Sequence, residues 1–241
     1  MRLLSATHGP VTAEEGGGPR DLPHASGNAP WALWVTEEFR LITTDDGTPA
    51  LQARARPGSF LPEVTIYPLD RGDVRPLQRV FDGLSPRSRQ MRFLAATPYL
   101  NPEMAAQLAD VDHETRGCWV AAIGGEPIGI GRYIRTAEDP TVAEIALEVV
   151  DACQGQGVGR LLLGVVGTAA ADAGITSLLW LMDEDNRRVR RLAAPLGGRF
   201  TLECGVLEGT TALPSVAPLD AAQIVRCARA ARRRAAARTA A

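Results

Sequence analysis

The sequence predicts a mixed α/β fold in which a sheet of about six to seven strands is flanked by helices. Its 241 residues are 45% hydrophobic and 22% charged, which is ordinary for a globular protein. Short apolar runs alternate as strands do, and other runs repeat at helical spacing. Their order is strand, helices, three strands, helix, strand, helix and strand, which differs from a succession of βαβ units.

Two segments precede the predicted main domain. Residues 1–30 are rich in glycine and proline and poor in apolar residues, so we expect a mobile N-terminal tail. Residues 31–61 form an N-terminal extension whose apolar runs surround Asp46-Gly47, a pair compatible with a hairpin turn. The main domain is then predicted over residues 62–215.

The first half of the main domain is predicted to hold one strand and three helices. Residues 63–69 alternate in polarity as a strand does. Asp73 is a candidate cap for a helix whose apolar residues lie on one side. The pairs Ser85-Pro86 and Asn101-Pro102 each combine an N-cap residue with proline at the first helical position, and so predict two further helix starts.

The second half is predicted to continue with strands and helices in alternation after a hairpin. Gly124-Gly125 separates the two apolar runs of that hairpin. The helix from Gly157 shows apolar residues at offsets of three, four, seven, eight and eleven from Val158, which form one helical stripe. The elements predicted here are strands 118–123, 127–134 and 142–150, helix 157–173, strand 176–182, helix 186–196 and strand 199–204.

Residues 216–241 are rich in alanine and arginine and predict a basic C-terminal helix or tail. From Asp220 onward there are six arginines and one acid, a net charge of about +5. The main interpretation is a solvated terminal helix, and the alternative is contact with an acidic partner or nucleic acid.

Composition excludes several classes of function. All 26 basic residues are arginine, so a Walker A phosphate loop and lysine Schiff-base chemistry are excluded. The net charge of −2 argues against nucleic acid as a partner, and the four cysteines contain no CxxC pair that would indicate zinc. No signal-peptide pattern or bilayer-length apolar run is present, so we expect a cytoplasmic protein without a membrane partner.

The most informative segment follows the strand 142–150. Three glycines, Gly155, Gly157 and Gly159, alternate where the amphipathic helix begins. Backbone N–H groups at a helix N-terminus lack intrahelical partners and carry partial positive charge, so this arrangement favours a pyrophosphate. A Rossmann GxGxxG motif would require glycine where Arg160 stands. Arg160 is a candidate for a charge-assisted bond to phosphate.

In this segment Gln154-x-x-Gly157-x-Gly159 resembles the Q/R-x-x-G-x-G/A motif of the GNAT superfamily of N-acetyltransferases. The resemblance covers residues of about 62–205, and its spacing is most similar to bacterial protein lysine acetyltransferases. It implies a GNAT-like sheet that holds acetyl-CoA as co-substrate between two parallel strands, with no metal. The cofactor-binding residues implied are Leu147 and Val149 for the pantetheine, Gln154, Gly155, Gln156, Gly157, Val158, Gly159 and Arg160 for the pyrophosphate, and Asn186.

Two carboxylates are candidates for the general base. Glu144 and Glu148 lie four residues apart, so an unbulged strand places both on one face with Ala146 between them. An amine must lose a proton before it can attack a thioester, which requires such a base. The resemblance implies that the base lies in an Ala-Glu-Ile step ten residues before the glutamine of the loop, so Glu144 is ranked first and Glu148 second.

The predicted reaction is direct acetyl transfer from acetyl-CoA to a primary amine, with a protein lysine as the favoured acceptor. Many small-molecule members of the family carry a tyrosine acid seven residues after the equivalent of Asn186, where this chain has Ala193. That departure favours a protein acceptor and also leaves two alternatives open. These are a small-molecule amine acceptor and a non-catalytic acyl-CoA-binding regulatory module. The oligomeric state, including a homodimer, is left open.

Overall fold

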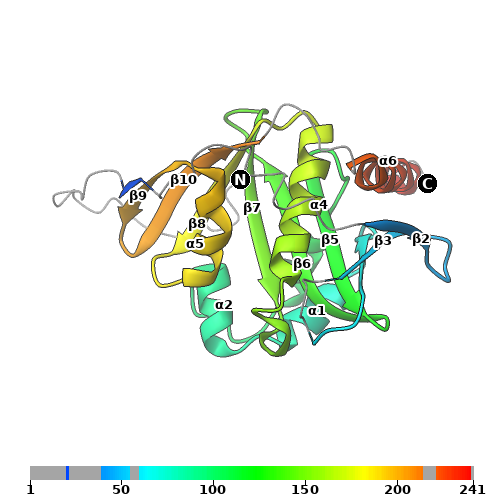
Figure 1. Cartoon of the computed structure of the whole chain (residues 1–241), viewed down its shortest axis with the longest axis horizontal. Helices are drawn as coiled ribbons and strands as arrows, with labels where there is room; N and C mark the ends of the chain where they lie inside the picture. Colours follow the sequence, from blue (N-terminus) through cyan, green and yellow to red (C-terminus); the bar gives the residue numbers. More distant parts are fainter. Residues whose placement is uncertain (1–19, 22–38, 55–59, 214–220, 240–241) are drawn as a thin grey trace.

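The computed structural model describes residues 20–21, 39–54, 60–213 and 221–239, and these residues build one large sheet with helices on both faces (Figure 1). Ten strands are hydrogen-bonded in the order β1-β9-β10-β8-β7-β6-β5-β4-β3-β2 within this described part. They are β1 Arg20–Asp21, β2 Arg40–Thr43, β3 Pro49–Ala53, β4 Val64–Pro68, β5 Arg116–Ile123, β6 Glu126–Arg135, β7 Val142–Val149, β8 Ser177–Asp183, β9 Arg199–Glu203 and β10 Val206–Ala212.

The α-helices of the described residues divide between the two faces of the sheet. They are α1 Arg75–Asp82, α2 Pro86–Phe93, α3 Pro102–Ala109, α4 Val158–Asp172, α5 Arg187–Ala193 and α6 Ala221–Thr239. Strand β5 shows the division, because successive side chains of a strand point to opposite faces. Trp119 and Ala121 pack in the core that includes α4, whereas Cys118 and Val120 pack in the core formed with α1 and α3.

Helix α4 lies close to the centre of the sheet because β6 supplies glycines beneath it. A Cβ atom at Gly131 would stand 2.8 Å from Val166 Cγ2 and 3.2 Å from Leu162 Cβ, so only glycine fits this approach. Two short 3-10 turns, Asp151–Cys153 before α4 and Ala194–Leu196 after α5, complete this side of the fold.

The predicted α/β class is confirmed, but the prediction of six to seven strands was too low. Strand β10 was missed because Glu208, Gly209 and two threonines interrupt its apolar pattern. It pairs with β8 along its whole length and is needed to cover that strand. The other additional strands come from the N-terminal segments, since β2 and β3 extend the sheet at β4 and β1 pairs with β9.

The structure tests only part of the predictions for the N-terminal segments. Strands β2 and β3 pair antiparallel on either side of the turn at Asp46 and Gly47. The tail predicted over residues 1–30 lies outside the described residues, apart from Arg20 and Asp21. The division of the chain at residues 30, 61 and 215 stays a prediction.

Helix α6 is packed against the domain, in contrast to the solvated helix that was the main interpretation of the sequence. Ile224, Cys227 and Ala228 are buried at a helical spacing, and the helix contacts α4, β3 and β4. Four of its arginines form ion pairs with acidic residues of the same chain. We call this group the helix clamp; its members are Asp70, Asp172, Arg229, Arg232, Arg234 and Arg238.

The helix clamp fixes α6 at two points. Asp172, at the end of α4, accepts from Arg229 and Arg232 at 2.8 Å each. Burial raises the pKa of Asp172, but the hydrogen bonds from these two arginines outweigh it and hold the pKa below its ordinary value. Further along, Arg238 donates to Asp70 at 2.9 Å. Arg232 also donates to the carbonyl of His113 at 2.7 Å.

Candidate functional site

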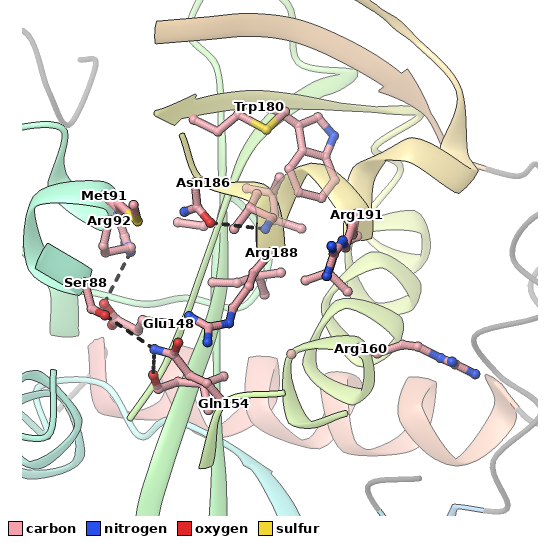
Figure 2. A pocket seen from close by; sticks show the side chains of 18 of the residues that line it. Ser88, Met91, Arg92, Glu148, Gln154, Arg160, Trp180, Asn186, Arg188 and Arg191 are labelled. Carbon is pink, nitrogen blue, oxygen red and sulfur yellow. Dashed lines mark hydrogen bonds and ion pairs between the residues drawn. The ribbon is translucent and has the colours of Figure 1, made fainter. Parts of the chain in front are cut away.

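The site lies where two parallel strands of the sheet stop pairing. Strands β7 and β8 are matched at three residue pairs, the last of which joins Glu144 to Leu179. Both strands continue beyond that pair, and a pocket of about 540 Å³ lies between their carboxyl-terminal halves. Its size falls in the range of small-molecule sites. The remaining walls come from α2, the glycine loop and α5 (Figure 2).

The glycine loop closes one end of the pocket. Gly155 and Gly157 have φ values of +74° and +99°, a left-handed region that side chains with a Cβ rarely adopt. Gly157 is the N-cap of α4 and offers no side chain to cap the helix. The N–H groups of Val158 and Gly159 have no preceding helical turn to accept from them, whereas the N–H of Arg160 donates to the Gly157 carbonyl at 2.9 Å. The helix dipole adds positive potential. This end of the pocket is therefore suited to an anion such as pyrophosphate.

Gln154 shapes the loop through hydrogen bonds within the protein. Its Nε2 donates to the carbonyl of Val149 at 2.9 Å and to Asp151 Oδ1 at 3.0 Å. Burial raises the pKa of Asp151, yet hydrogen bonds from Ser85 and Ser88 outweigh it and lower the pKa overall. The side-chain amide nitrogen of Gln154 therefore braces the turn between β7 and α4.

The structure brings most of the predicted cofactor-binding residues together around the pocket. Val158 and Gln156 are the exceptions, because neither contributes to the pocket wall and the Val158 side chain is buried in the core. The predicted residues that do line the pocket are Leu147, Val149, Gln154, Gly155, Gly157, Gly159, Arg160 and Asn186.

Helix α5 contributes a cap residue and two cations to the pocket. Asn186 Oδ1 accepts from the N–H of Val189 at 3.2 Å and begins the helix, as the sequence predicts. Arg188 and Arg191 are exposed and line the pocket; the Arg188 side chain extends toward Gln154 in Figure 2. Ala193 is completely buried, so no acid reaches the pocket from that position.

The two candidate carboxylates lie on the β7 face that looks toward α2. Glu144 is half-buried and Glu148 is buried, and both line the pocket. Their environments differ because Glu148 Oε2 stands 3.3 Å from Arg92 Nε, with 6% and 13% of the two side chains exposed. Glu148 on β7 therefore forms a buried ion pair with Arg92 of α2.

Two functional candidates, Arg92 and Arg132, were missed by sequence reasoning. Arg92 is the α2 partner of Glu148, and Arg132 on β6 is 2% exposed beside the same carboxylates. The chain has 26 arginines, so residue type carried no signal for these two. For Arg132, its position within an apolar strand opposite a two-glutamate strand was the available clue.

Two other properties concern only the described part of the chain. Its histidine, cysteine, aspartate and glutamate side chains form no group of three that could hold a metal ion. Within the same ranges, no helix has both the length and the apolarity needed to span a membrane.

Comparison with known proteins identifies a family for this geometry. The model of the acetyltransferase (GNAT) family matches residues 84–197. Acetyltransferase PA5475 of Pseudomonas aeruginosa is 30% identical over 138 residues, which are 56% of this chain and 74% of that protein. Acetyltransferase Pat of Mycolicibacterium smegmatis is 30% identical over 112 residues, 45% of this chain; the match spans 34% of that longer protein.

Solved structures share the fold. The GNAT domain of S. lividans PAT aligns with a TM-score of 0.59 and 25% identity, covering 76% of this chain and 98% of that one. The protein yncA of Salmonella typhimurium, solved with its cofactor acetyl-CoA, aligns with a TM-score of 0.50 and 17% identity. That alignment covers 64% of this chain and 96% of yncA, and it shows a common fold alone.

Proposed function

We propose that this chain, which belongs to the acetyltransferase (GNAT) family, acetylates lysine side chains of protein substrates with Glu144 as the general base. The family membership makes it an acetyl-CoA-dependent N-acetyltransferase. The protein acceptor and the identity of the base are the proposed parts. The observation that carries the proposal is the opening between β7 and β8, with the glycine loop at its end and Glu144 at its apex.

The pocket fits acetyl-CoA by the chemistry of its two ends. The N-terminus of α4 with Gly155 and Gly157 suits the pyrophosphate, and Arg160 stands beside it. Beyond Glu144 the β7 backbone is no longer paired with β8, so its peptide groups toward β8 are open to the pantetheine amides, apart from the Val149 carbonyl, which accepts from Gln154. We therefore assign Leu147 and Val149 to pantetheine binding and Asn186 to the opposite wall.

The chemistry requires the chain to remove one proton. Acetyl-CoA supplies an activated thioester, so a neutral amine can displace the CoA thiolate directly. A lysine ammonium has a pKa of about 10.4 in water and must first lose a proton. We assign this step to the Glu144 carboxylate, directly or through one water. The neutral nitrogen then attacks the thioester carbonyl and loses its second proton to solvent as the carbon–sulfur bond breaks, which leaves the amide and the CoA thiolate. No covalent enzyme intermediate is needed.

Glu144 is preferred to Glu148 because the two carboxylates have different partners. Glu148 is buried and ion-paired with Arg92, so taking up a proton there would leave a buried guanidinium without its counter-charge. Glu144 stands half-buried where the β7–β8 pairing ends. A base at that point faces the pocket that opens between the two strands.

The departing thiolate receives no proton from α5. Ala193 occupies the place where many small-molecule members have tyrosine, and it is buried. We assign the protonation of the thiolate to solvent. Protein-acetylating members often lack this tyrosine, which supports a protein acceptor over a small amine.

The proposal is tested by replacing the base and comparing acceptors. We expect Glu144→Gln to lower kcat by about 10² to 10⁴-fold, because general base catalysis contributes that much, while CoA affinity measured by calorimetry stays unchanged. Glu208→Gln, on an exposed position of β10, is the matched control and should keep full activity. Full activity of Glu144→Gln would overturn the assignment of the base.

The acceptor is identified by mass spectrometry of proteins and small amines incubated with acetyl-CoA. The enzyme contains no lysine, so every acetyl-lysine detected belongs to an added substrate. We expect acetyl-lysine on protein substrates at rates well above those for small amines. Acetylation of small amines alone would replace the protein acceptor with a small-molecule one.

A further inference from the structure

Arg132 is a buried cation within an otherwise uncharged stretch of β6. It lies on β6, is 2% exposed, and its Nε has no hydrogen-bond partner among the described residues. Burial lowers its pKa, although an arginine side chain stays protonated in proteins. Burying such a charge is costly unless opposite charges lie near it.

The register of the sheet places Arg132 between the two glutamates. Its direct partner on β7 is Ala146, and directly paired residues of neighbouring strands share a face. Glu144 and Glu148 lie two residues to either side of Ala146 on that same face. Each is therefore a diagonal neighbour of Arg132, at a separation that a long side chain can bridge.

Four charges thus gather in what we call the site cluster, which consists of Arg92, Arg132, Glu144 and Glu148. Arg132 interacts electrostatically with both glutamates, and Arg92 is ion-paired with Glu148 at 3.3 Å. Two guanidinium groups and two carboxylates balance. Arg92 and Arg132 both act on Glu148, and Arg132 also acts on Glu144.

We propose that Arg132 is a positioning residue that keeps Glu144 ionised and ready to accept a proton from the substrate. This inference rests on the proposed role of Glu144 as general base. A buried guanidinium one strand away favours the carboxylate over the carboxylic acid without blocking the side that faces the pocket. The base is then available at lower pH than it would be without Arg132.

Several other groups face the same region and set the background for this effect. Cys118 on β5 is the other direct neighbour of Arg132, and burial raises the pKa of its thiol to about 12, so it stays neutral. The groups with charge that line the pocket with Glu144 are Arg92 from α2, Glu148 from β7, Arg160 from α4, and Arg188 and Arg191 from α5. The β8 residues opposite, Leu179 and Leu181, carry none.

The test is the pH profile of kcat/KM for wild type, Arg132→Met, Arg132→Lys and Glu144→Gln, with calorimetry of CoA binding for each. Methionine removes the charge and keeps an unbranched side chain. We expect Arg132→Met to move the acidic limb up by roughly one pH unit. At pH values below the limb, kcat/KM of Arg132→Met would then be about tenfold lower than that of wild type. On the plateau at higher pH, the two values should be similar. Arg132→Lys should restore most of the shift, and CoA affinity should be unchanged.

The outcomes separate this inference from the proposed function. Full activity of Glu144→Gln removes the proposed base. Loss of activity in Glu144→Gln together with an unmoved limb in Arg132→Met overturns the role of Arg132 alone. If Arg132→Met does not bind CoA, Arg132→Gln is the second neutral variant, judged by the same shift. Failure of both neutral variants to bind CoA, with Arg132→Lys active, would give Arg132 a structural role and overturn the proposal.

Discussion

The site cluster and the helix clamp are built from the same two residue types but in different surroundings. In the helix clamp, Asp172 receives short hydrogen bonds from two arginines, and the Arg229 side chain is 62% exposed. In the site cluster, Arg132 and Glu148 are buried, and the Nε atoms of Arg92 and Arg132 have no hydrogen-bond partner among the residues described. Arg234 of the helix clamp also has buried nitrogens, Nε and Nη2, without a hydrogen-bond partner among the described residues, so the contrast concerns Asp172 and its two arginines. Those ion pairs are hydrogen-bonded and partly exposed at Arg229, whereas the site cluster is buried and incompletely hydrogen-bonded.

We interpret the difference as a division between a group that serves stability and a group that serves the proposed reaction. Solvent-screened pairs contribute little per bond but are cheap to form, which suits the attachment of a helix. A buried cluster with unsatisfied donors is costly, and such a cost is typical of functional sites, where it alters the proton affinity of a reacting group. If this interpretation is right, disrupting the site cluster should lower the free energy of unfolding more than disrupting the helix clamp.

The largest effect is expected when the buried ion pair is broken on one side. Arg92→Met leaves Glu148 buried without its closest counter-charge, so we expect a loss of about 3 kcal/mol in unfolding free energy, measured by urea titration. Arg132 remains beside Glu148 and keeps the loss toward the lower end of the usual range. The double variant Arg92→Met/Glu148→Met should recover most of it. A loss below about 0.5 kcal/mol in Arg92→Met would contradict the contrast.

A smaller effect is expected in the helix clamp. Asp172→Asn weakens two ion pairs at once, but Arg229 is exposed and its contribution is screened. We expect a loss of about 1 kcal/mol near pH 7. Raising the salt concentration should lower wild-type stability toward that of the variant, because exposed pairs are screened. A loss as large as that of Arg92→Met would show that the two groups do not differ in kind.

The same variant has a defined pH dependence. The pKa of Asp172 in the folded chain lies below its ordinary value of 3.8, so the carboxylate contributes stability above pH 3.8. That contribution is lost as the pH falls through the lower, folded-state pKa. The stabilities of wild type and Asp172→Asn should therefore converge in acid and stay apart at neutral pH. A difference that grows on acidification would contradict this linkage.

The smallest effect is expected at an exposed arginine outside both groups. Arg226 lies on α6, is exposed, and forms no ion pair with the other described residues. Arg226→Ala should change the unfolding free energy by less than about 0.5 kcal/mol. A larger change would mean that the basic face of α6 contributes beyond the helix clamp.

The part of the site best predicted from sequence is the run from β7 through the glycine loop into α4. The predicted helix over residues 157–173 is observed as Val158–Asp172, and the strand predicted at 142–150 ends at Val149. These features depend on local rules, since left-handed glycines, apolar periodicity and strand alternation are properties of neighbouring residues. The same rules failed at β10, whose pairing with β8 outweighs a weak local pattern.

Sequence alone determined the residues of the glycine loop, the amphipathic face of α4 and the shared face of Glu144 and Glu148, because each follows from spacing along one segment. Tertiary structure decided which glutamate is paired, which two of 26 arginines lie beside them, and that α6 is docked by Asp70 and Asp172. These outcomes depend on the register between strands and on contacts between distant segments. The interaction between two charges is set by their distance and burial in the folded chain, and no pattern within either segment encodes those quantities.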